Sequence, residues 1–169
     1  MATAQPPSGL AAAAGAWLGF LLLVAAHFAI RPLFASRANV DFLLIAILFS
    51  AVRVRPGLAA LLGLAAGFTV DALAPGSFGA AALSLVAVAF AASRVKAVFF
   101  ADHVALTGLF VFVGKVAFDV VYASVSGGVR GMQLVVQLLL WTPLSAALTA
   151  AVAVILLTLF KPLYRPVTG

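Results

Sequence analysis

Long apolar stretches alternate with short groups of charged and turn-forming residues along this chain. The first stretch, LAAAAGAWLGFLLLVAAHFAI at 10–30, approaches the ~20 residues that an α-helix needs to cross the hydrocarbon core of a bilayer. The breaks between stretches carry arginine, lysine, proline or glycine, which keep charge in water or end a helix. The pattern predicts six helices, at about 10–30, 40–52, 57–74, 78–93, 104–126 and 132–160.

Composition places these helices in a membrane. Hydrophobic residues make up 66% of the 169 positions and charged residues 8%, whereas about a quarter of an ordinary soluble domain is charged. The alternating ten-residue pattern that is typical of outer-membrane barrel strands does not occur in the sequence. We therefore expect an all-α fold, a polytopic transmembrane helical bundle that forms a single integral membrane domain over 1–169.

Basic residues between the stretches predict the orientation of the helices. Six spans with a cytoplasmic N-terminus place Arg53, Arg55, Arg94, Lys96, Lys161 and Arg165 inside and Arg31, Arg37 and Arg130 outside. The C-terminus is then cytoplasmic. Segment 40–52 is short, since 13 residues of helix cover only about 20 Å, so a five-span chain with its N-terminus outside remains an alternative. The first stretch lacks the charged leader of a signal peptide, so we expect it to be retained.

One helix carries a stripe of small residues. Ala59, Gly63, Gly67 and Asp71 are spaced by four, so they share a helix face. Small residues let two helices approach closely in a membrane, where lipid gives no hydrophobic drive for association. The stripe predicts a close helix contact, made either within the chain or with a partner helix. The turn PGSFG follows, with Pro75, Gly76 and Gly79, and we expect it on the outer side.

Charged residues inside the apolar stretches predict a polar cluster. Lys115 and Asp119 are four apart in one stretch, and such residues almost always face protein because exposure to lipid is costly. Helical rise puts Lys115 ~16 Å, Asp119 ~22 Å and Asp71 ~21 Å from the cytoplasmic ends of their helices. We therefore predict that Asp71, Lys115 and Asp119 form an intramembrane cluster. It could be a structural clasp, a proton or ion relay, or a partner contact; otherwise, Asp71 would cap or brace the following turn.

The sequence lacks the residues and motifs that usually carry catalysis or bind a cofactor. There is no cysteine, no glutamate, no GxSxG, no HExxH and no P-loop, which disfavours nucleophilic, zinc-hydrolytic and nucleotide chemistry. His27 and His103 are too few and too far apart for a metal site, and a lone buried histidine is usually a core residue. Because no basic cluster occurs, nucleic acid is not an expected partner. We expect a protein that is not an enzyme and has no cofactor.

Residues 39–95 resemble the MreD family of bacterial rod-shape membrane proteins. The resemblance lies in the basic turn RVRPG, the helix GLAAGFTVDAL and the turn PGSFG. It implies a non-enzymatic scaffold of the elongasome in the bacterial cytoplasmic (inner) membrane. Such a scaffold binds MreC and links MreB to peptidoglycan synthesis by RodA and its transpeptidase partner, and so sets rod cell shape. Asp71 and the glycines around it match the family pattern, whereas Lys115 and Asp119 gain no support from it.

A transport role is the alternative. The family is similar in architecture to the S components of energy-coupling-factor (ECF) vitamin transporters, which implies a possible substrate-binding subunit. That function would need an outward-facing pocket lined by polar and aromatic groups, and this chain has few polar side chains for one.

Overall fold

The computed structural model describes residues 9–30, 40–73, 75–99, 104–128 and 131–160. Its helices are α1 (Gly9–Ile30), α2 (Phe42–Ala51), α3 (Pro56–Leu73), α4 (Ala80–Phe99), α5 (Val104–Ser126), α6 (Met132–Val136) and α7 (Thr142–Phe160). A 3-10 turn, η2 (Pro75–Ser77), precedes α4, and a π-helical turn, η3 (Gln137–Trp141), joins α6 to α7. No strand occurs in these ranges, and the predicted all-helical fold is confirmed.

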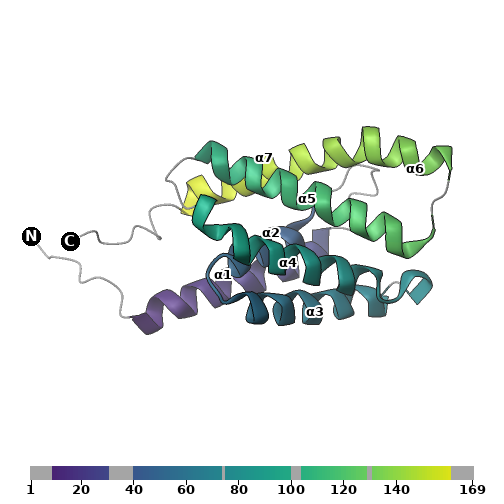
Figure 1. Ribbon diagram of the computed structural model, residues 1–169. Helices are drawn as coiled ribbons and strands as arrows, with labels where there is room; N and C mark the ends of the chain where they lie inside the picture. The colour runs from purple at the N-terminus through teal and green to yellow at the C-terminus, as the bar shows by residue number, and fades with distance from the viewer. Residues whose placement is uncertain (1–8, 31–39, 74, 100–103, 129–130, 161–169) are drawn as a thin grey trace, which may run out of the picture.

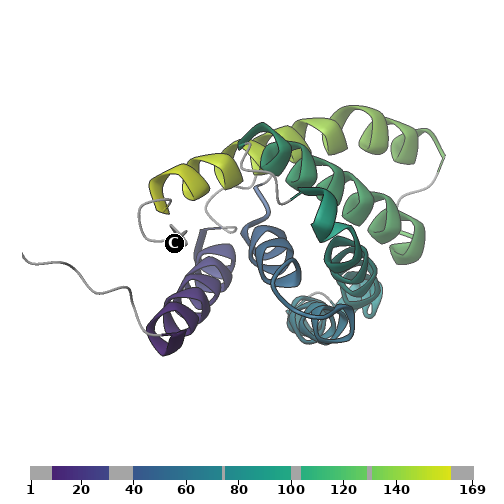
Figure 2. The ribbon, with the colours of Figure 1, turned by 60° about the vertical axis from the view of Figure 1, so that its left-hand side comes forward.

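The helices form a bundle of antiparallel neighbours. Helix α3 packs along α4, and α5 packs along α7, so the two pairs are the main layers of the molecule (Figure 1). In the turned view, α2 lies between α1 and the α3–α4 pair, beneath α5 and α7 (Figure 2). The chain thus passes back and forth along one axis.

The short helix α2 is the core of the bundle. Six successive residues, 43–48, are buried, so α2 is covered on every side, as a helix that is apolar all round should be. It contacts α1, α3, α4, α5 and α7. Ten residues of helix extend only about 15 Å, and burial begins at the second residue of the helix, Leu43, so α2 begins inside the bundle. The segment that looked weakest as a membrane span is therefore the central element of the fold.

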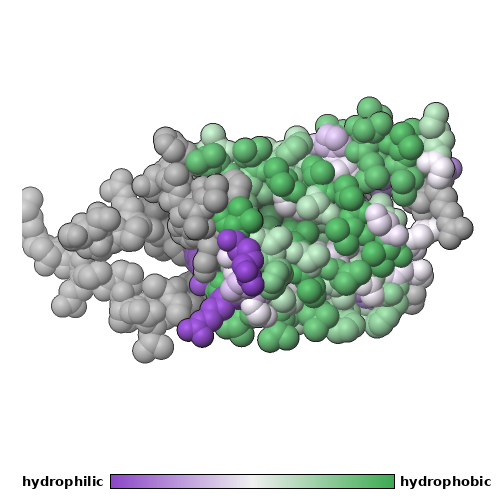
Figure 3. Space-filling model, in the orientation of Figure 1, coloured by the Kyte–Doolittle hydropathy of each residue, from purple (hydrophilic) through white to green (hydrophobic). Residues whose placement is uncertain are grey.

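Length and hydropathy agree with a membrane-spanning bundle. Three helical stretches in the described ranges are long and apolar enough to cross a membrane, namely Pro56–Leu73, Val104–Ser126 and Met132–Leu159. Shorter apolar helices cover Trp17–Ala29, Phe42–Ala51 and Ala80–Val95. The face of the molecule in Figure 3 is largely apolar among the described residues, and large hydrophobic side chains are exposed on α1, α3, α4, α5 and α7.

Exposed arginines gather at one end of the bundle. Arg53 and Arg55 lie between α2 and α3, and Arg94 lies near the end of α4. Hydrophilic surface is visible at this end in Figure 3. Of the other basic residues used above to predict orientation, Arg31, Arg37, Arg130, Lys161 and Arg165 lie outside the described residues.

Candidate functional site

The small-residue stripe of α3 faces α4. Ala59 and Gly63 are buried, and a Cβ atom added to Gly63 would lie 2.6 Å from the carbonyl oxygen of Leu85. A Cβ added to Gly67 would overlap the backbone of Ala82. Only glycine permits so close an approach of the two backbones. The stripe therefore packs against α4 of the same chain.

Asp71 closes the joint between α3 and α4. Its side chain is 1% exposed, and its two carboxylate oxygens accept hydrogen bonds from the backbone amides of Ala81 at 3.0 Å and Ala82 at 2.9 Å. Both amides belong to the first turn of α4, where no helical carbonyl is available to them. The negative charge also lies at the favourable end of the α4 dipole. Asp71 therefore caps a helix from outside that helix.

The predicted cluster of Asp71 with Lys115 is corrected by these contacts. Both oxygens of Asp71 are bonded to α4, and the ammonium of Lys115 is paired with Asp41 and Asp119 instead. The sequence predicted only that Asp71 and Lys115 lie at a similar depth along the bundle axis. It did not predict where their helices lie around that axis. Asp41 occupies the place that the sequence interpretation gave to Asp71.

The turn between α3 and α4 is tied to α5. Pro75 and Gly76 lie in η2, and Ser77 Oγ lies 2.9 Å from the hydroxyl of Tyr122 on α5. Gly79, just before α4, has a φ of 93°, which a residue without a side chain adopts without strain.

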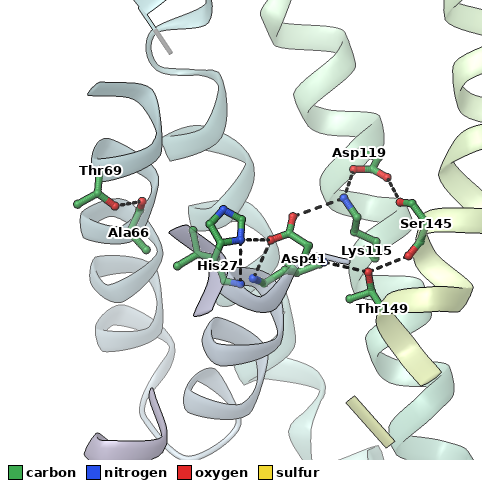
Figure 4. Close-up of polar contacts among 10 residues, drawn as sticks. His27, Asp41, Ala66, Thr69, Lys115, Asp119, Ser145 and Thr149 are labelled. Atoms are coloured by element: carbon green, nitrogen blue, oxygen red, sulfur yellow. Dashed lines mark hydrogen bonds and ion pairs between the residues drawn. The ribbon is translucent and has the colours of Figure 1, made fainter. Parts of the chain in front are cut away.

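A second group of polar side chains lies deep in the bundle. It consists of His27 on α1, Asp41 before α2, Lys115 and Asp119 on α5, and Ser145 and Thr149 on α7 (Figure 4). We call this group the polar centre. It joins elements that are up to 108 residues apart in the sequence.

The N-terminus of α2 is held by the polar centre. Asp41 is its N-cap, and Asp41 Oδ1 accepts a hydrogen bond from the amide of Leu44 at 3.2 Å. The amide of Leu43 donates to His27 Nδ1 at 3.4 Å, and the amide of Asp41 donates to Thr149 Oγ1 at 3.2 Å. The first backbone amides of a helix have no acceptor within the helix. Here three of them find acceptors on α1, on α7 and on the cap residue itself.

Lys115 connects the two carboxylates of the polar centre. Its Nζ atom lies 2.6 Å from Asp119 Oδ1 and 3.5 Å from Asp41 Oδ2. Ser145 Oγ donates to Asp119 Oδ2 at 3.5 Å, which brings in α7. Lys115 is 7% exposed, so little water compensates these charges.

A cavity of about 210 Å³ lies beside the polar centre. His27, Asp41, Lys115 and Asp119 line it, and Gln137 and Trp141 of the π-helical turn form part of its wall. Pockets for drug-sized ligands measure roughly 300–1,000 Å³, so this cavity suits water or a small polar group. In the described part of the chain, no group of three or more His, Cys, Asp or Glu residues could hold a metal ion.

Sequence interpretation missed Asp41 and assigned His27 to the core. Asp41 stands immediately before an apolar run, which is the usual place of a helix N-cap, so its local role was readable. Its contacts with Lys115 and Thr149 are long-range and left no local signal. His103 lies outside the described residues.

The fold and the polar centre define the class: an integral membrane protein built as a helical bundle with a charged interior. A family model described as rod shape-determining protein MreD matches residues 13–167. This match covers nearly the whole chain, so the chain belongs to the MreD family and is a rod-shape-determining membrane protein. No curated protein and no solved structure matches it, and the expected likeness to S components gains no support.

Proposed function

We propose that this chain is a non-enzymatic scaffold of the elongasome in the bacterial cytoplasmic membrane. In this role it binds MreC and couples MreB to peptidoglycan synthesis by RodA and its transpeptidase partner. The observation that carries the proposal is the family match over residues 13–167. Rod cell shape is then the property that depends on the chain.

The internal contacts support a scaffold of fixed shape. The polar centre joins α1, α2, α5 and α7, and the Asp71 cap joins α3 to α4. Because the small-residue stripe is occupied by α4, a partner helix would bind elsewhere on the apolar surface. Intramembrane polar contacts of this kind hold helices in register where lipid supplies no hydrophobic drive.

The cavity beside the polar centre is small for a vitamin-binding pocket. At about 210 Å³, the cavity is smaller than the roughly 300–1,000 Å³ of drug-sized ligand pockets. The charged groups that line it are already engaged with one another.

Orientation follows from the arginine-rich end. Arg53, Arg55 and Arg94 favour placing this end in the cytoplasm, since short cytoplasmic loops are enriched in basic residues. The ends of α1 and α7 nearest the chain termini lie toward the same end (Figure 1), which supports six crossing segments and a cytoplasmic C-terminus. Reporter fusions after Pro166 test this orientation, and periplasmic activity of the reporter would contradict it.

Recovery of partners from native membranes tests the proposed function. The tagged chain, solubilised in mild detergent from its own bacterium, should recover a single-span periplasmic coiled-coil protein, as expected for MreC. An untagged strain provides the background. Depletion of the chain should make rod cells round, and the tagged chain should restore their shape. Recovery of paired ATPase subunits, with unchanged cell shape on depletion, would favour the transporter.

A further inference from the structure

Three exposed arginines are brought together by one hydrogen bond between α4 and the turn before α3. Ser93 Oγ donates to the carbonyl oxygen of Val54 at 2.8 Å. Arg53 and Arg55 flank Val54 in the sequence, and Arg94 follows Ser93, so the two backbone segments that carry the arginines are in direct contact. All three arginines are exposed. We call this group at one end of the bundle the arginine patch.

The described carboxylates lie away from the arginine patch. Two of the four acidic residues of the sequence belong to the polar centre. Asp71 is bonded to the first turn of α4, whereas the patch lies near the last turns of that helix. Asp102 lies outside the described residues. Arg55 and Arg94 form no ion pair with a described carboxylate, so the patch is a region of positive charge that suits an anion.

Apolar side chains border the arginine patch on the surface of the bundle. Leu58 and Leu61 of α3 are 54% and 60% exposed, and Phe90 of α4 is 41% exposed. Leu58 follows Arg55 by three residues. Phe90 precedes Arg94 by four, so each arginine lies about one helical turn from an exposed apolar side chain. Figure 3 shows hydrophilic surface directly beside apolar surface at this end. Such a boundary suits an amphiphilic ligand, whereas a free anion would contact only the charge.

The ring of Phe90 orients the guanidinium group of Arg94. Arg94 Cζ lies 5.1 Å from the centroid of this ring. A guanidinium group that stacks on a ring presents its N–H groups at its edge, and this planar set of donors matches the oxygens of a phosphate. Helix α4 thus holds a phosphate-binding group beside an exposed apolar ring.

We propose that the arginine patch binds the phosphate of an anionic phospholipid. Arg55 and Arg94 donate to the phosphate oxygens, and the acyl chains lie along the apolar surface of α3 and α4 beside Leu58 and Phe90. A zwitterionic headgroup would place its ammonium group among the arginines, where no described carboxylate receives it, so a headgroup with net negative charge is preferred. The bound lipid belongs to the leaflet that meets this end of the bundle. This inference is independent of the proposed elongasome function.

Thermal unfolding in nanodiscs tests the proposal. The full chain should melt at a higher temperature in nanodiscs that contain phosphatidylglycerol, which is anionic, than in nanodiscs of phosphatidylcholine alone. Arg55→Gln combined with Arg94→Gln should lose this difference, yet melt like the wild type in phosphatidylcholine, where the patch has no anionic lipid to bind. Arg31→Gln combined with Arg130→Gln removes the same charge from positions outside the described residues and should keep the difference. If the first double variant kept the full difference, the proposal would be wrong.

Native mass spectrometry of the chain in detergent measures lipid selectivity. The wild type should bind phosphatidylglycerol about tenfold more tightly than phosphatidylcholine, and the double Gln variant should lose this preference. Arg55→Lys combined with Arg94→Lys keeps the charge without the planar donors, so it should weaken the preference without abolishing it. If the Gln variant failed to fold, the wild-type preference and the Lys variant would decide, and equal binding of the two lipids by the wild type would overturn the proposal.

Two competitors separate the phospholipid from other anions. Free glycerol 3-phosphate carries the phosphate without acyl chains, so it should not displace phosphatidylglycerol at equal concentration. A poly-glutamate peptide should not displace it either, because it offers nothing to the apolar border of the patch. Displacement by glycerol 3-phosphate would identify a site for free phosphate, and displacement by poly-glutamate would identify a site for an acidic protein. Either result would contradict a phospholipid site.

Discussion

Two helices of this protein, α2 and α4, are each capped by an aspartate at the N-terminus. At α4, Asp71 reaches across from α3, and two backbone amides occupy both of its oxygens. At α2, Asp41 belongs to the chain of the helix itself, and its carboxylate is shared among an amide, an imidazole and an ammonium group. Asp71 thus bonds only backbone amides of one helix. Asp41 instead takes part in a network of polar and charged side chains beside a cavity.

The difference lies in what can change at each site. The two backbone amides that donate hydrogen bonds to Asp71 cannot change partners unless α4 unwinds. This joint therefore has a single arrangement. The contacts of Lys115 with Asp41 and Asp119 join side chains, so they can change without unwinding a helix. The Asp71 joint is therefore fixed by backbone groups, whereas the polar centre depends mainly on contacts between side chains.

The largest expected effect comes from breaking the α3–α4 joint at Gly67. Gly67→Leu forces a side chain into the backbone of Ala82, which cannot move aside as a flexible side chain can, so α3 and α4 cannot keep their close contact. Because the obstacle is backbone, we expect most of the folded protein to be lost from the membrane fraction. Gly57→Leu is the matched control on the same helix, since nothing lies within 4 Å of its added Cβ. Equal abundance of the two variants would show that α3 and α4 are not in close contact.

Removal of the cation from the polar centre ranks next. Lys115→Met leaves Asp41 and Asp119 without their shared partner, and breaking a buried pair costs about 3–5 kcal/mol. Arg94→Met removes an exposed charge at the end of α4 and should have little effect. Melting temperatures in nanodiscs compare the two. Lys115→Met combined with Asp119→Asn should be milder than Lys115→Met alone, and failure of this rescue would contradict the ion pair.

Asp71 and Lys115 should be energetically independent. Asp71→Asn keeps one carbonyl oxygen for the amides of Ala81 and Ala82, so we expect a loss of about 1–3 kcal/mol. Because Asp71 bonds the backbone of α4 and Lys115 pairs with Asp41 and Asp119, the effects of Asp71→Asn and Lys115→Met should add within about 0.5 kcal/mol. The measurement is a double-mutant cycle on unfolding. A clear coupling energy between Asp71 and Lys115 would instead support the cluster that the sequence predicted.

The smallest effect is expected at Thr149. Thr149→Val removes the acceptor for the part-buried amide of Asp41, and the net contribution of one such hydrogen bond is about 1 kcal/mol. Thr158→Val on the same helix is the control, since Thr158 is exposed and bonds only the backbone of its own helix in the contacts described. Hydrogen exchange at the first amides of α2 should increase for Thr149→Val and stay unchanged for Thr158→Val. Unchanged exchange in both would show that Thr149 does not hold α2.

Local sequence patterns predicted the parts of this fold that depend on one helix. Apolar length predicted the all-helical class, the spacing of Gly63 and Gly67 predicted a face for close contact, and the spacing of Lys115 and Asp119 placed them on one helix face. The position of a helix around the bundle has no such local signal. For this reason Asp71 was given Lys115 as a partner, while Asp41, which lies 74 residues from Lys115 in the sequence, was not.

The central position of α2 has a consequence for biosynthesis. A segment of ten residues is too short to span the bilayer by itself, and the acceptor for the amide of its cap residue, Thr149, is translated 108 residues later. The N-terminal part of the chain therefore cannot reach its final arrangement until the ribosome has produced α7. Nascent chains arrested before Thr142 should leave a cysteine introduced at Leu43, which is buried in the finished fold, open to water-soluble maleimides, and full-length chains should protect it. Protection in the arrested chains would mean that α2 is placed without help from α7.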